Sequence, residues 1–238
     1  MTPIVSLIDA VTFGISVFVA VHLYGSYRKA PNIYVKYFFF CFVFVAVTFL
    51  LLASPGIITT DSMILAVLSA ISNFTTIGSV MYFTLIPLLL LRQSRFIAPY
   101  AAFMALVGLG TLVIGLTNLE PYVTVTYGRL AFWLPASSPI MDLTRAVSGV
   151  VLFLSLLAAG GTFIVYGVLQ GTSQRIRSVL LGGSALLFAL SGAVNFILGA
   201  APAPGAFLVA AFLSLAALLV LVRGIFYRPE TSEWGRIK

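Results

Sequence analysis

The sequence predicts an all-α membrane protein: a bundle of seven transmembrane helices with its N-terminus outside the cell and its C-terminus in the cytoplasm. Three observations support this prediction. First, 61% of the 238 residues are hydrophobic and only 8% are charged, which does not describe a water-soluble domain. Second, the apolar runs reach about 20 residues, the length that a hydrocarbon layer of roughly 30 Å requires. Third, Lys and Arg fall in alternate connections, and basic residues stay on the cytoplasmic side.

The charges divide unevenly between the two sides of the predicted bundle. Eleven of the thirteen basic residues and two of the six acidic residues fall on one side, which gives it a net charge of +9. The opposite side holds two basic and four acidic residues, for a net charge of −2. We therefore expect anionic lipid headgroups as partners at the cytoplasmic rim. Nucleic acid is not expected as a partner, because no soluble basic patch is large enough to neutralise several phosphates.

The spans are separated by recognisable turn and capping signals. Pro31 stops the first run, Ser54-Pro55-Gly56 turns the chain after the second, and Asp61 or Thr60 can cap the third. Residues 228–238 are expected to form a short cytoplasmic tail without a soluble domain, so that any intracellular output needs a partner chain. The predicted spans are about 3–24, 35–53, 62–91, 96–117, 139–169, 178–199 and 205–227.

The longest connection covers residues 118–138 and belongs to the outer side. Alternating Val and Thr between Tyr122 and Tyr127 predict a short extended segment, and Phe132 and Trp133 are expected at the headgroup level. We interpret this connection as a surface loop that lies on the bundle. A lid over a bound ligand is the alternative.

Residues that hold cofactors are scarce. His22 is the single histidine and Cys41 the single cysteine, so the chain lacks paired haem ligands and thiolate clusters. Retinal pigments with seven helices need a lysine inside the seventh span, whereas Lys29, Lys36 and Lys238 lie outside all spans. We expect no cofactor, no metal and no enzymatic activity, because no serine–histidine or cysteine–histidine arrangement exists.

Polar residues inside the third span are candidates for function. Ser72, Thr75, Thr76 and Ser79 share one helical face, next to Asn73. Such residues commonly hydrogen-bond to their own helix or to a neighbouring one. The alternative is a water-filled face that binds a ligand.

Charged and amide residues near the outer span ends extend this candidate site. Asp142 and Arg145 can pair at i, i+3, and Ser191 and Asn195 face the same space from the sixth span. Asp9 lies one to two turns inside the first span, where a charge is costly and usually faces the bundle interior or water. We predict an outward ligand pocket between spans one, three, five and six, with ion pairs that only fix helix register as the alternative. Its candidate residues are Asp9, Ser72, Asn73, Thr76, Asp142, Arg145 and Asn195.

One segment, from Tyr127 to about Leu198, is similar to a known family. The residues that carry the likeness are Tyr127-Gly128, Phe132-Trp133, Gln174, Arg175 and Arg177. They resemble the seven-helix sensor domain found at the N-terminus of some archaeal and bacterial histidine kinases. Arg129 stands where a proline is expected, and no kinase domain follows. The resemblance implies a receptor-like bundle that senses an outer or membrane-borne signal, and it implies no particular ligand.

Three classes of function remain open. The first is a non-enzymatic, multi-pass plasma-membrane protein of the sensor or receptor type, which binds a small or lipid-like ligand in its outer half and acts through a protein partner or oligomer. The second is a cofactor-free structural subunit of a larger membrane complex, such as a respiratory assembly. The third is a small-solute transporter or channel.

Overall fold

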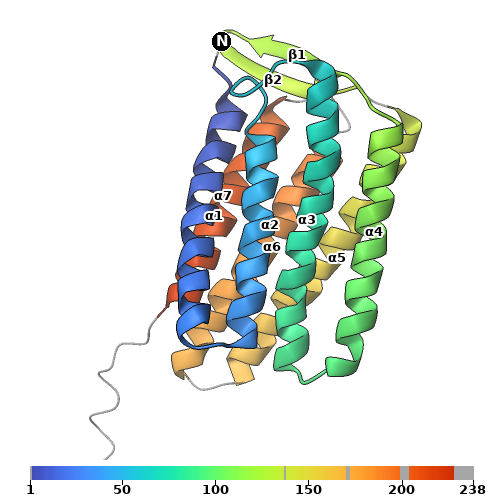
Figure 1. Ribbon diagram of the computed structural model, residues 1–238. Coiled ribbons are helices and arrows are strands. Elements are labelled where there is room, and N and C mark those ends of the chain that lie inside the picture. Colours follow the sequence, from blue (N-terminus) through green and yellow to red (C-terminus); the bar gives the residue numbers. More distant parts are fainter. Residues whose placement is uncertain (1, 137, 170–171, 199–203, 228–238) are drawn as a thin grey trace, which may run out of the picture.

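The computed structural model describes residues 2–136, 138–169, 172–198 and 204–227. Within these ranges it contains seven long helices, a short 3-10 helix and one two-stranded sheet (Figure 1). All seven helices are long and apolar enough to cross a membrane, which is the architecture of a multi-pass membrane protein. The elements are α1 (Ile4–Lys29), α2 (Ile33–Leu52), α3 (Ser62–Leu90), η1 (Ser94–Phe96), α4 (Ile97–Thr117), β1 (Tyr122–Tyr127), β2 (Leu130–Pro135), α5 (Pro139–Leu169), α6 (Thr172–Leu198) and α7 (Pro204–Phe226).

Two of the helices extend beyond the predicted spans. The first span was expected to end near residue 24, but α1 continues to Lys29, because basic residues in a last turn interact favourably with the helix dipole. The sixth was expected to begin near residue 178, but α6 starts at Thr172. The other five ranges agree to within two residues. The predicted tail 228–238 and the end of the sixth span at residue 199 lie outside the described residues.

Side-chain caps fix where two helices begin. The carboxylate of Asp61 accepts hydrogen bonds from the backbone N–H groups of Met63 and Ile64 at 2.9 and 3.0 Å, as the sequence predicts for the start of α3. The side chain of Asn32 accepts one from the N–H of Tyr34 at 2.8 Å and starts α2. These bonds satisfy donors that a helix start leaves free.

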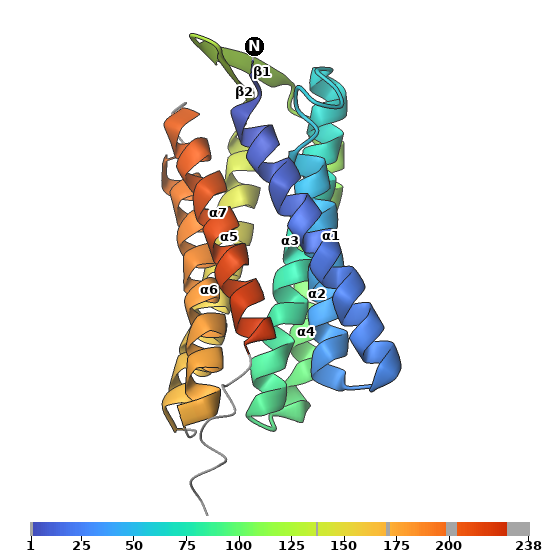
Figure 2. The same cartoon turned by 90° about the vertical axis from the view of Figure 1, so that its left-hand side faces the viewer.

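The helices form two layers, α1–α4 and α5–α7 (Figure 2). Consecutive helices pack most extensively against each other within each layer, whereas the layers meet mainly along α1 with α7 and along α3 with α5. Between the layers, the rings of Phe83 and Phe163 lie 5.6 Å apart. A single hydrophobic core therefore joins both layers, although the helices of different layers contact each other less than neighbours within one layer.

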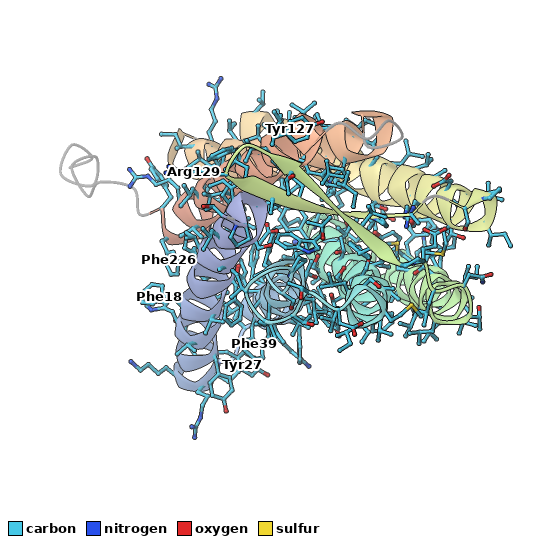
Figure 3. The ribbon with its side chains drawn as sticks, turned by 90° about the horizontal axis from the view of Figure 1, so that it is seen from above. Phe18, Tyr27, Phe39, Tyr127, Arg129 and Phe226 are labelled. Atoms are coloured by element: carbon cyan, nitrogen blue, oxygen red, sulfur yellow. The ribbon has the colours of Figure 1, made fainter. Side chains whose placement is uncertain are left out.

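The hairpin β1–β2 lies across one end of the bundle (Figures 1 and 3). Its antiparallel register pairs Val125 with Phe132. Gly128 has a φ of +60°, as the first residue of a tight two-residue hairpin turn requires. The N–H of Thr2 donates to the carbonyl of Arg129 at 2.7 Å, and the N–H of Ala131 donates to the carbonyl of Thr2 at 3.1 Å. The backbone just before α1 thus holds the hairpin in place.

Because consecutive helices run in opposite directions, alternate connections meet at the same end of the bundle. The described acidic residues and most of the described basic residues therefore gather at opposite ends. The described acidic residues all lie at the hairpin end, together with Arg129 and Arg145. The opposite end, hereafter the basic end, holds the other described basic residues. These are Arg28, Lys29, Lys36, Arg92, Arg95, Arg175, Arg177 and Arg223.

Candidate binding cavity

A cavity of about 880 Å³ lies between the two helix layers at the hairpin end. Its walls come from α1, α2, α3, α5, α6 and α7, and β2 contributes its roof. No residue of α4 is among the described lining residues. Sites for small organic molecules commonly enclose about 300–1,000 Å³, so this cavity is large enough for such a ligand.

The structure brings all seven candidate residues to this one cavity. They are Asp9 on α1, Ser72, Asn73 and Thr76 on α3, Asp142 and Arg145 on α5, and Asn195 on α6. The sequence placed the site between spans one, three, five and six, and the structure adds α2, α7 and the hairpin as further walls. That these residues bind a ligand stays a prediction.

Arg145 is the centre of an ion-pair network at the hairpin end of the cavity. Its guanidinium lies 3.2 Å from the carboxylate of Asp142, which confirms the predicted i, i+3 pair. It also lies 2.7 Å from the carboxylate of Glu120, which is buried. Sequence reasoning missed this second partner because the two residues are 25 positions apart, although Glu120 is the single acidic residue between Asp61 and Asp142. The pair ties the base of the hairpin to α5.

Asp9 is the least compensated charge of the cavity. Its side chain lines the cavity and the residue is only 5% exposed. No hydrogen bond or ion pair joins it to any other described residue. A buried carboxylate without a partner is costly, and inside a membrane such residues usually mark a functional site.

The polar face of α3 makes hydrogen bonds to its own helix and also lines the cavity. Ser72, Thr76 and Ser79 line the cavity, and each donates to a carbonyl three or four residues earlier, at 2.8 to 2.9 Å. Thr75 differs from the prediction of one shared face: its hydroxyl is hydrogen-bonded to that of Thr48 on α2 at 2.8 Å. Successive residues of a helix are rotated by about 100° about its axis, so Thr75 lies at the edge of this face, toward α2. Ser72, Thr76 and Ser79 face the cavity.

The opposite wall is built by α6 and α7. The Ser191 hydroxyl donates to the carbonyl of Ala210 and is hydrogen-bonded to the hydroxyl of Ser214, both at 2.8 Å. The sequence predicted that Ser191 and Asn195 face the same space, and both line the cavity. Ser214 was missed, since nothing in one sequence tells which face of α7 meets α6. Asn73 on α3 and Asn195 on α6 also line the cavity, and no hydrogen bond joins either amide to another described residue.

The roof consists of Phe132, Trp133 and Leu134. Phe132 and Trp133, which the sequence predicts at the headgroup level, both line the cavity, and Phe132 is buried. The Trp133 ring packs on Gly56, where a Cβ atom would lie 2.3 Å from the ring. Only glycine permits this contact, and at a φ of +72° it is also the favoured residue.

Tyr122 occupies the base of the hairpin and also lines the cavity. Burial raises the pKa of its phenol above the ordinary value. The side chain is therefore a neutral hydroxyl at physiological pH, able to donate or accept a hydrogen bond. Together with Asn73 and Asn195 it gives the cavity uncharged polar groups on three sides.

The floor of the cavity is apolar. Phe83, Leu156 and Leu221 line its inner end, and Phe163 packs beyond them with 1% exposure. His22 lies farther along, with its ring 4.9 Å from that of Phe226 in an edge-on contact. The cavity thus combines polar groups toward the hairpin end with an apolar, aromatic base, which is the usual composition of a small-molecule site.

No known protein family matches the chain, and no curated protein is significantly similar to it.

Proposed function

We propose that this chain is a non-enzymatic, multi-pass membrane protein of the sensor or receptor type, which binds a small or lipid-like ligand and acts through a partner chain. Its N-terminus and hairpin would face the outside, and its basic end the cytoplasm. The charge asymmetry between the ends supports this orientation, because Lys and Arg near span ends resist translocation. In a plasma membrane the cavity would then open toward the cell exterior.

The cavity is the observation that carries the proposal. Seven polar residues chosen from sequence line one space of about 880 Å³, between two helix layers that touch along few helices. A ligand that contacts both walls would favour one spacing of the layers over another. Differential binding of this kind shifts a conformational equilibrium. A partner chain bound at the basic end would respond to the changed spacing of the layers.

The subunit alternative is favoured by one feature, the outer face of α4. This helix buries only Met104, Gly108 and Gly115, and its apolar side chains Phe103 and Leu106 are exposed. Such a face suits either lipid or the helices of another chain. A transporter is less well supported, because it calls for a broken helix near mid-membrane, and the seven helices are unbroken over the described residues.

A cavity-filling variant tests the proposal. Gly192 lines the cavity on the face of α6 that also carries Phe188, Ser191 and Asn195, and a Cβ there meets no atom within 4 Å. The chain is purified in native lipid, and bound small molecules are identified by mass spectrometry. We expect a bound compound in the wild type that Gly192→Leu loses.

Gly183→Leu is the matched control. It makes the same substitution on the same helix, also meets no atom within 4 Å, and lies outside the cavity lining. It should retain the compound. If the protein is instead recovered only within a large stable assembly with an empty cavity, the sensor proposal is wrong and the subunit alternative stands.

A further inference from the structure

Building on the proposed function, we infer that the cavity selects an amphipathic cation: a protonated amine attached to an apolar body, with Asp9 as the residue that binds the amine. Three features support this ligand class. The carboxylate of Asp9 is buried, and the cavity lining is rich in aromatic residues. Arg145, the only arginine among the described lining residues, is already paired with two carboxylates.

Asp9 has the position that charge recognition requires. It lies on the same face of α1 as Val5 and Ser6, which also line the cavity, and Ser6 is buried as well. Its carboxylate meets no cation among the described residues. Because a buried ion is stabilised mainly by an opposite charge and by hydrogen bonds, a bound ammonium group would supply what the protein itself does not.

Arg145 is not available to play this part. Its guanidinium already contacts two carboxylates, those of Glu120 and Asp142. Among the described residues that line the cavity, the charged ones are Asp9, Asp142 and Arg145, whose formal charges sum to −1 when Asp9 is ionised. A cavity with a net negative wall attracts a cationic ligand and repels an anionic one.

The rest of the lining fits an apolar body. Phe49 and Phe83 extend from the first layer, Phe188 and Phe207 from the second, and Phe132 from the roof. Aromatic faces attract ammonium groups within about 6 Å of the ring centre, and they also pack against hydrocarbon. An amine near Asp9 can therefore place its apolar part among these rings toward the floor.

The test uses three compounds that share one apolar body and differ only in their head group: phenylbutylamine, phenylbutanol and phenylbutyrate. Binding to the full chain in lipid nanodiscs is followed by tryptophan fluorescence and by calorimetry at neutral pH. For the wild type we expect the amine to bind at least about tenfold more tightly than the alcohol, which corresponds to one decade of Kd. The acid should bind most weakly.

The variants separate charge recognition from general effects. Asp9→Asn keeps the shape of the side chain and should reduce amine affinity to that of the alcohol, while alcohol affinity stays unchanged. Asp9→Glu keeps the charge and should keep the amine preference. Asp61→Asn is the matched control, since it removes the same charge at the same end, lies outside the cavity lining, and can still cap α3.

Two outcomes would overturn the assignment to Asp9. One is equal affinity of the wild type for the amine and the alcohol, and the other is an amine preference that survives Asp9→Asn. Either result would show that the Asp9 carboxylate does not recognise the charge of the ligand, while the cavity remains a binding site. If none of the three compounds binds, the amine class is wrong. The Gly192→Leu experiment then decides independently whether the cavity holds any ligand at all.

Discussion

The hairpin end and the basic end of the bundle are built from the same helices but differ in how tightly these helices pack. At the basic end, large side chains such as Ile86, Met104 and Phe163 are almost fully buried. At the hairpin end the same two layers separate around a cavity lined by carboxylate, amide and hydroxyl groups. Packing at one end holds the fold together, so the other end can tolerate polar groups and empty space. The comparison predicts that mutations at the two ends affect different measurements.

The largest expected effect is on stability at the basic end. Phe163→Ala removes a ring that is 1% exposed and contacts Phe83 between the layers. It should lower the free energy of unfolding by about 3–5 kcal/mol, the usual cost of truncating a buried aromatic residue. Phe132→Ala at the cavity roof should cost clearly less, because its ring borders empty space. Thermal unfolding in nanodiscs measures both, and equal losses would contradict the contrast between the ends.

A pair of neighbouring glycines tests how tightly the second layer is packed. A Cβ on Gly182 would lie 2.7 Å from the carbonyl oxygen of Gly160 on α5, whereas one on Gly183 meets nothing within 4 Å. Gly182→Ala should therefore destabilise the protein by about 1–3 kcal/mol through overpacking. Gly183→Ala should be neutral or stabilising by up to about 1 kcal/mol, because alanine favours helix. The same unfolding measurement applies, and a Gly182→Ala protein as stable as the control would show that α5 and α6 can move apart freely.

The smallest expected effect concerns the attachment of the hairpin. Glu120→Gln weakens the contact with Arg145, whose side chain is 30% exposed, so solvent screening limits the loss to about 1 kcal/mol. Amide hydrogen exchange in β1 and β2 should nevertheless become faster, while exchange at the basic end stays unchanged. Unaltered exchange in the hairpin would mean that the contacts of Thr2 and Gly56 hold it without the ion pair.

The features that the sequence predicted correctly are those that depend on one helix at a time. Span number, the Asp61 cap and the Asp142–Arg145 pair follow from hydrophobic length and from the i, i+3 spacing of a single helix. The seven candidate residues met in one cavity because polar groups in an apolar bundle avoid lipid and turn inward.

The features that the sequence missed depend on the relative rotation of two elements. The Thr48–Thr75 hydrogen bond, the contact of Ser214 with Ser191, and the Glu120–Arg145 pair each join distant segments. Hydrophobicity predicts that a helix spans the membrane, but it does not predict which face of that helix contacts a given neighbouring helix. The roof of Phe132 and Trp133 was not predicted for a related reason, since aromatic residues at a span end suit both a headgroup layer and a cavity.

The backbone contact of Thr2 with β2 has a practical consequence for protein engineering. Because two hydrogen bonds at 2.7 and 3.1 Å join Thr2 to Arg129 and Ala131, a peptide fused directly ahead of this residue emerges beside the hairpin. An affinity tag in that place would lie next to the roof of the cavity and could disturb these two hydrogen bonds. Tags and fluorophores therefore belong after α7, where they leave this seam undisturbed.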